Sequence, residues 1–278
     1  MHCVMDIRHI SFYITGEELN MNMIEVSNLS KTYGHKHAVR NLSFKVNEGE
    51  LFAFLGPNGS GKSTTIKMLM GLTENTSGDI EILGEQPGVN SISLKKKVSF
   101  VPDTPDIMGK LTGKEYLDFV ASVYGMTQKK YEEKSEEMLE LFELTGTLGT
   151  LVEEYSHGMR QKLVIIGALM HEPKVVFMDE PNVGLDPKSN RNLKNYLKKY
   201  VAGGNTVFLT THTLSLAEEI ADRILIIFEG EEKATGTLSE LRIKSGLESG
   251  TLEDVFLSLT GEEEMDVSDS ESRDAIGG

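Results

Sequence analysis

The sequence has few of the residues that mark secreted or membrane-spanning proteins. Of its 278 residues, one is cysteine (Cys3) and none is tryptophan. A single cysteine excludes an internal disulfide framework and suits a reducing compartment. The longest apolar runs, such as residues 224–228, are far shorter than the ~20 residues that cross a bilayer. We therefore expect a folded protein whose chain has no membrane span.

Basic residues are also scarce. Lys and Arg number 28 against 43 Asp and Glu, which gives a formal net charge of −15. Residues 245–278 hold ten acidic residues and one Arg. This balance argues against general nucleic-acid binding, which depends on clustered Lys and Arg. We predict no nucleic-acid partner and a disordered acidic tail after Thr260.

A glycine-rich loop is the strongest functional signal in the chain. Residues 56–63 read Gly-Pro-Asn-Gly-Ser-Gly-Lys-Ser and fit the phosphate-binding pattern of glycine, four residues and Gly-Lys-Ser/Thr. Glycines let several backbone N–H groups converge on phosphates, because a Cβ would block the approach. The helix that follows adds the positive end of its dipole. The residues predicted to hold the nucleotide here are Gly56, Pro57, Asn58, Gly59, Ser60, Gly61, Lys62, Ser63 and Thr64.

The surroundings of this loop support the interpretation. Residues 51–55 form a continuous apolar run that is typical of a buried parallel strand, and residues 64–70 favour a helix. Strand, glycine loop and helix is the order that the motif requires. We predict that Lys62 reaches the β- and γ-phosphates of a nucleotide and that the Ser63 hydroxyl ligates Mg²⁺.

A pair of acidic residues ends a second apolar strand. Asp179 and Glu180 follow residues 174–178, so they are expected at the carboxyl end of a buried strand. An aspartate placed there beside the phosphate loop can hold Mg²⁺, and a second carboxylate can orient and deprotonate an attacking water. Taken alone, the pair also fits simple solvation of a strand end. Together with the glycine loop, it favours a catalytic site.

The remaining pattern predicts an α/β fold: a P-loop NTPase core with an antiparallel β subdomain and a helical insertion subdomain. Alternation of apolar and polar residues indicates half-exposed strands in front of the core, and helical spacing indicates the insertion. Half-exposed strands are expected at 24–26, 42–46 and 78–84, helices at 111–144 and 156–170, and further core strands at 206–210 and 224–227.

Two further motifs resemble those of the ATP-binding subunits of ABC transporters. Residues 155–159 (Tyr-Ser-His-Gly-Met) match the family signature Leu-Ser-Gly-Gly-Gln at Ser156 and Gly158. The resemblance implies that these two residues grip the γ-phosphate bound to the other protomer of a dimer. Residues 184–187 (Gly-Leu-Asp-Pro) resemble the D-loop, which implies that Asp186 lies across the dimer interface.

Three single residues extend the resemblance. His212 corresponds to the family's switch histidine, which contacts the γ-phosphate and helps to place the water. Tyr33, expected in the loop after the first strand, corresponds to an aromatic that stacks on adenine. Asp103 stands where the family has a glutamine. An aspartate can touch Mg²⁺ through water, but it adds negative charge near the triphosphate.

The resemblance covers about residues 23–246 and implies an ATP-binding and ATP-hydrolysing subunit of a membrane exporter. ATP and Mg²⁺ are the implied cofactors, with Glu180 as general base. The implied partners are a separate transmembrane permease subunit and a second ATP-binding subunit, in a homodimer or heterodimer. Such a subunit is peripheral at the cytoplasmic face of the cell membrane. Residues 252–261 also resemble the C-termini of bacterial exporter ATPases.

We divide the chain accordingly into an N-terminal extension of unknown role (1–20), an ATP-binding domain (21–246, with its helical subdomain at about 103–170) and a C-terminal helix with the acidic tail (247–278). Two alternatives stay open. A soluble ABC ATPase of translation or DNA repair usually carries two cassettes or long coiled-coil insertions, which are not seen here. A regulatory subunit with weak catalysis would be in keeping with Asp103 and with the departures from the signature. Nothing in the sequence indicates the cargo.

Overall fold

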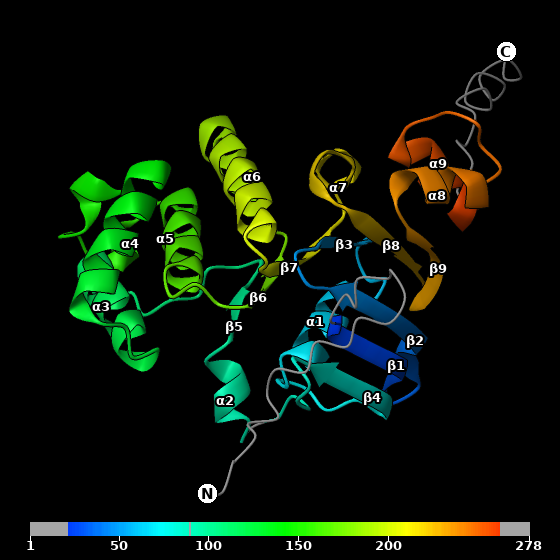
Figure 1. The fold of residues 1–278 in the computed structure, drawn as a ribbon, viewed down its shortest axis with the longest axis horizontal. Helices are drawn as coiled ribbons and strands as arrows, with labels where there is room; N and C mark the ends of the chain where they lie inside the picture. Colours follow the sequence, from blue (N-terminus) through cyan, green and yellow to red (C-terminus); the bar gives the residue numbers. More distant parts are fainter. Residues whose placement is uncertain (1–21, 89, 262–278) are drawn as a thin grey trace, which may run out of the picture.

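Two β-sheets organise the protein in the computed structural model, which describes residues 22–88 and 90–261 (Figure 1). The predicted extension 1–20 and the acidic tail beyond Gly261 lie outside the described residues. In the same view, a lobe of helices lies at one end of the molecule and the antiparallel sheet lies toward the other.

The first sheet has three antiparallel strands in the order β2-β1-β4. Their bounds are Asn22–Tyr33 for β1, Lys36–Asn47 for β2 and Ser77–Ile82 for β4. In β2, Leu42, Phe44 and Val46 are buried, and the residues between them are exposed. Alternation with period two puts one face of a sheet on the core and the other in water, which confirms the half-exposed strands.

The second sheet has six strands in the order β5-β6-β7-β3-β8-β9. The pairs are parallel except that β9 runs antiparallel to β8. Every residue of β3, β6 and β7 is buried, as expected for strands covered on both faces. The strand bounds are Leu51–Leu55 (β3), Val98–Val101 (β5), Val175–Asp179 (β6), Thr206–Thr211 (β7), Arg223–Phe228 (β8) and Glu231–Gly236 (β9).

Side chains of this second sheet alternate between two hydrophobic clusters. In β7, Val207 and Leu209 join the cluster that the helical lobe and α6 (Pro187–Ala202) share, whereas Phe208 joins the cluster beneath the antiparallel sheet. Helix α1 (Lys62–Leu69) packs on the Phe208 side, and α6 with α7 (Leu214–Ile220) covers the opposite face. The sheet is therefore enclosed on both faces, and its carboxyl edge is left to present functional side chains.

Three helices build the lobe (Figure 1), and a Thr or Ser side chain caps the start of each. They are α3 (Gly113–Val123), α4 (Gln128–Phe142) and α5 (His157–Leu169); the short α2 (Ile92–Lys95) precedes them. The predicted helical stretch 111–144 is thus two helices, separated at Gly125, whose φ of +65° suits glycine. Ser156 caps α5, as predicted, by accepting a hydrogen bond from the Met159 backbone N–H at 3.2 Å.

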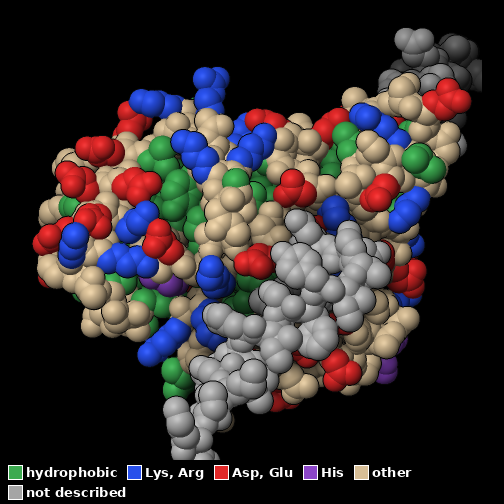
Figure 2. Space-filling model, in the orientation of Figure 1, with side chains coloured by type: hydrophobic (Ala, Val, Ile, Leu, Met, Phe, Trp, Pro, Cys, Tyr) green, Lys and Arg blue, Asp and Glu red, His purple; other side chains and the backbone are tan. Residues whose placement is uncertain are grey.

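The last described elements, α8 (Leu238–Lys244) and α9 (Leu252–Thr260), pack against β8 and β9. Leu252 and Val255 are fully buried in the cluster that also holds Ala53 of β3. Within residues 22–88 and 90–261, each helix is too short or too polar to span a membrane. On the face in Figure 2, side chains of both charges are interspersed over the helical lobe.

Candidate active site

The glycine-rich loop lies between β3 and α1, where tight packing leaves no room for a side chain at two of its glycines. A Cβ on Gly56 would lie 2.3 Å from the Ile227 carbonyl oxygen, and one on Gly61 would lie 2.5 Å from the Ala38 carbonyl oxygen. Gly61 also has a φ of +111°, which L side chains rarely adopt. At Gly56 and Gly61 the loop therefore approaches its neighbours with backbone alone.

A hollow of about 300 Å³ opens over this loop. Two lysines, Lys36 and Lys62, line it, and no carboxylate is among the described residues that do so. The hollow is therefore suited to an anion. Its lining is Tyr33, Lys36, Ala38, Asn58, Gly59, Gly61, Lys62, Ser63 and Thr64.

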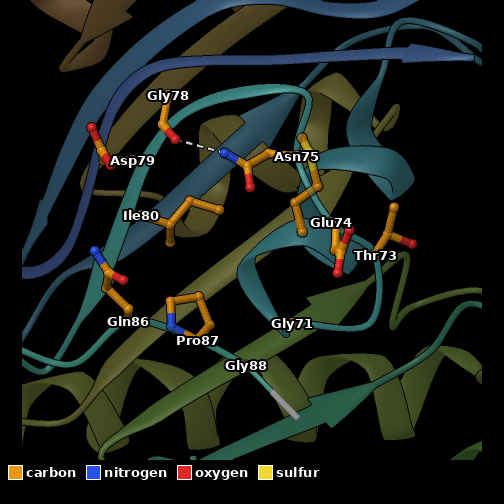
Figure 3. Close-up of a pocket in the computed structure, with 11 residues that line it drawn as sticks. Gly71, Thr73, Glu74, Asn75, Gly78, Asp79, Ile80, Gln86, Pro87 and Gly88 are labelled. Atoms are coloured by element: carbon orange, nitrogen blue, oxygen red, sulfur yellow. Dashed lines mark hydrogen bonds between the residues drawn. The ribbon is translucent and has the colours of Figure 1, made fainter.

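A second hollow of about 320 Å³ lies at the other end of α1 and has the opposite charge (Figure 3). Glu74 and Asp79 belong to its lining, which includes no Lys or Arg among the described residues. Asn75 donates a hydrogen bond to the Gly78 carbonyl oxygen across its edge at 2.6 Å. Since the two hollows are similar in size, charge decides between them, and the hollow over the glycine loop is the one that fits phosphates.

Lys62 is buried and bonded within its own loop. Its Nζ donates to the carbonyl oxygens of Gly56 at 2.7 Å and Pro57 at 3.2 Å, and it lies 3.8 Å from Glu180 Oε1. Burial lowers the pKa of Lys62, and the charges of Glu180 and Asp179 act in the opposite direction. The ammonium is thus held in place by weak acceptors that a phosphate could replace.

Asp179 ends β6 and lies beside Ser63. Its carboxylate accepts a hydrogen bond from the Thr210 hydroxyl, and the Ser63 hydroxyl is close enough to affect its pKa. Burial raises the pKa of Asp179, and the charges of Asp103 and Glu180 raise it further, while the two hydroxyls lower it. A nearby cation would stabilise the ionised form of this carboxylate, because its positive charge offsets both the burial and the neighbouring negative charges.

The Glu180 side chain contacts both the Lys62 end of the glycine loop and the residues at the end of β7. Its Oε1 lies 2.7 Å from His212 Nδ1, and its Oε2 accepts a hydrogen bond from the Thr211 hydroxyl at 3.0 Å. Because β3, β6 and β7 are neighbours in the sheet, their carboxyl ends meet at one edge. Lys62, Glu180 and His212 therefore form a continuous series of contacts.

Tyr33 and Asp103 complete this group in different ways. Tyr33 is the last residue of β1 rather than part of the following loop, and half of its surface is exposed. Lys31 Nζ lies 4.9 Å from the centre of its ring. Asp103 follows β5, accepts a hydrogen bond from the Thr104 backbone N–H at 2.8 Å, and acts on Asp179 through its charge.

The signature-like segment forms a separate group with the D-loop-like turn. A Cβ on Gly158 would lie 2.5 Å from the Gly184 carbonyl oxygen. Asp186 caps α6 and pairs with Lys162 Nζ at 2.7 Å. The Lys162 ammonium and the Ser189 groups lower the pKa of Asp186. Ser156, Gly158 and Asp186 contribute nothing to the described lining of the hollow over the glycine loop.

Two of the contacts that were not predicted involve lysines. Lys36 lines the hollow, and Lys162 holds Asp186. Lys36 gave no signal in the sequence because it belongs to no motif and reaches the loop only through the pairing of β1 with β2. Lys162 could have been found, because it lies on the helix that Ser156 opens.

A glycine loop between a buried strand and a helix, with an acidic pair at the end of a neighbouring strand, defines a P-loop nucleoside triphosphatase. Comparison with known proteins narrows this class. The sequence profile of the ABC transporter family matches residues 39–183. This chain therefore belongs to the ABC transporter family as an ATP-binding subunit, and it is an ATPase.

Relatives and a solved structure agree with this placement. The chain is 38% identical to the linearmycin resistance ATP-binding protein LnrL of Bacillus subtilis, over 81% of this chain and 72% of that protein. It is also 38% identical to the SkfA peptide export ATP-binding protein SkfE of Bacillus subtilis, over 76% of this chain and 87% of that one. A dimeric ATP-binding cassette in a post-hydrolysis state, bound to ADP and Pi, superposes with a TM-score of 0.71 and 27% identity, covering 78% of this chain and 99% of that one.

Proposed function

We propose that this chain is the ATP-hydrolysing subunit of an ABC-type exporter, peripheral at the cytoplasmic face of the membrane. The observation that carries the hydrolytic role is the contact series from Lys62 through Glu180 to His212 beside the hollow. Export is supported by the relative named for peptide export. The chemistry of the cargo belongs to a separate transmembrane permease subunit.

Mg²⁺ fits the groups at the phosphate end of the site. Ser63 and Asp179 supply oxygen ligands that lie close to each other, so one ion can bind both. Mg²⁺ usually binds through one or two carboxylates together with substrate phosphates. Bound with ATP, it neutralises charge on the phosphates. We assign Asp103 a contact with the ion through water.

The chain's own residues then divide the work of hydrolysis. Tyr33 stacks on adenine, and the amides of 56–64 surround the phosphates. Lys62 exchanges the Gly56 and Pro57 carbonyls for phosphate oxygens. Glu180 orients the attacking water and accepts its proton. His212, held against Glu180 and at the same edge of the sheet, keeps that carboxylate in position and contacts the γ-phosphate.

The remaining site residues act in a partner cassette, either a second copy or a similar chain. Ser156 and Gly158 open α5, where the backbone N–H groups and the helix dipole favour a phosphate. Their separation from the chain's own hollow is explained if they complete the site of the facing cassette. Asp186 lies beside them and would follow them into the same interface. The dimeric relative supports this arrangement.

The permease is proposed to dock on the helical lobe. Three large apolar side chains are exposed there or just before it: Met108 at 53%, Phe119 at 48% and Val123 at 55%. Phe119 and Val123 lie four residues apart on α3 and so share one face of that helix. Exposed apolar groups that share a face mark interaction surfaces. The lobe is attached to the core through the segment that contains Asp103, so force at the surface can reach the nucleotide.

The test of the hydrolytic role is ATP turnover by single variants. Lys62→Ala should lose nucleotide binding, because a buried ammonium at the phosphates is removed. Glu180→Gln should retain ATP binding and lower turnover roughly 100-fold or more, as expected when a general base is removed. Phosphate release and nucleotide titration measure the two effects. Wild-type turnover in Lys62→Ala would reject the site assignment.

A further inference from the structure

We propose that Lys36 is a second phosphate-binding lysine of the nucleotide site, in addition to Lys62. The inference rests on the nucleotide site proposed above. No motif contains Lys36, and its placement comes from the strand pairing alone. The group that it would bind is the phosphate chain of ATP or ADP, between the adenine ring and the phosphates held by Lys62.

The position of Lys36 follows from a tight hairpin. Tyr33 ends β1, Lys36 begins β2, and the two residues pair directly across the strands. The two-residue turn between them contains Gly34, whose φ of +57° such turns require. Lys36 is thereby held beside Tyr33, and both line the hollow that Ser63 and Thr64 line from α1.

The charge of the hollow makes this lysine distinctive. Lys36 and Lys62 are the cations in its described lining, which contains no carboxylate. Lys62 pairs with Glu180, from outside that lining, at 3.8 Å. Lys62 donates to loop carbonyls. Lys31, the nearest lysine in sequence, donates to the Glu74 carbonyl oxygen at 2.5 Å. By contrast, the Lys36 ammonium makes no hydrogen bond or ion pair with any residue of 22–88 or 90–261, so its donors are available.

The order of adenine, ribose and phosphates along a nucleotide determines which group Lys36 can contact. With adenine on Tyr33 and the terminal phosphates at Lys62, the segment between them carries the ribose and the inner phosphate. An ammonium on a flexible stem at the Tyr33 end of the hollow can reach that segment. An ammonium–phosphate contact is a charge-assisted hydrogen bond, which is about twice as strong as a neutral one. Lys36 would therefore act on ATP and ADP alike, because both carry the inner phosphate.

The test measures binding of fluorescent ATP and ADP analogues to the full chain and to four variants, one of which is Lys62→Ala. Lys36→Ala should weaken both nucleotides about five- to tenfold, which corresponds to the loss of one charge-assisted hydrogen bond at a partly open site. Lys36→Arg keeps the charge and should stay within about twofold of wild type. Lys45→Ala is the matched control, because Lys45 lies on the same strand but pairs with Glu25 at 2.7 Å. It should bind nucleotide like wild type.

The outcomes separate this inference from the site assignment. If Lys62→Ala loses nucleotide binding while Lys36→Ala binds like wild type, Lys36 is only a solvated surface lysine. The inference about Lys36 is then wrong, and the site assignment stands. If Lys36→Ala and Lys45→Ala weaken nucleotide binding equally, the effect comes from net charge alone, and this outcome also overturns the inference. If Lys62→Ala binds normally, the site assignment itself is wrong. Lys36 is exposed, so its variants should fold, and thermal unfolding verifies this.

Discussion

At the residue scale, Glu180 combines a rare backbone conformation with three polar contacts. Its φ is +48°, in the left-handed region that non-glycine residues seldom occupy. The same residue contacts Lys62, Thr211 and His212. Such strain persists where the surrounding structure holds it in place, and it gathers at functional sites. The conformation turns the carboxylate from the end of β6 toward β7 and the glycine loop.

A buried histidine outside the candidate site should make stability depend on pH. The His171 ring stacks on Tyr124 with centroids 3.5 Å apart, and burial lowers its pKa from 6.5 to about 4. The folded state therefore keeps His171 neutral while the unfolded chain takes up a proton. Stability from this group is complete above pH 6.5 and falls as the pH drops through 6.5 toward 4. By pH 5 the loss should be about 2 kcal/mol.

Urea unfolding at pH 7 and pH 5 checks this prediction, with His171→Phe as the control. Phenylalanine preserves an aromatic partner for Tyr124 and removes the titrating group. Other groups that titrate in this range contribute equally to both proteins, so the difference isolates His171. Two parallel curves of unfolding free energy against pH would contradict the prediction.

At the scale of elements, backbone contact between α5 and the turn before α6 explains why position 158 is a glycine. Replacing glycine by alanine inside a helix normally stabilises by about 1 kcal/mol. At Gly158 the added Cβ would meet the Gly184 carbonyl oxygen at 2.5 Å. We therefore expect Gly158→Ala to destabilise the protein by roughly 1–2 kcal/mol. Chemical denaturation measures the difference in unfolding free energy.

The matched control is Gly146→Ala, in the 3₁₀ turn Thr145–Thr147, where a Cβ would meet nothing within 4 Å. That variant should be neutral or slightly stabilised. Gly158→Ala should still bind nucleotide at the glycine loop, which lies on other elements. A stabilised Gly158→Ala protein would mean that α5 and the D-loop-like turn are not in backbone contact.

Elements with strong local patterns were predicted, and elements defined by their neighbours were not. Residues 51–55 and 175–178 are continuous apolar runs, so their burial was readable from the sequence. Strand β9 is polar along much of its length and exists as an edge strand because β8 offers hydrogen-bonding partners. Strand β5 has only four residues. Neither strand carries a pattern that separates it from a loop.

At the scale of the whole molecule, the separation of the signature-like segment from the hollow predicts assembly. Glu180→Gln should hold ATP without turnover, so that paired cassettes accumulate with MgATP. Size-exclusion chromatography should then show about twice the monomer mass, by the symmetry of a closed pair. Adding Lys62→Ala to this variant should return it to the monomer, because the nucleotide that joins the cassettes is lost. A Glu180→Gln protein that stays monomeric with MgATP would count against a shared site.

The sequence alone determined the local chemistry of this protein. The glycine loop, the acidic pair and the cap at Ser156 depend on residue types at short spacing, and short spacing is sufficient for a backbone cradle or a helix start. Tertiary structure decided which distant groups meet. The order of β6, β7 and β3 in the sheet brings Lys62, Glu180 and His212 into contact. A hairpin brings Lys36 to the hollow. Such contacts between distant residues arise from strand order and pairing register, which depend on packing across the whole core.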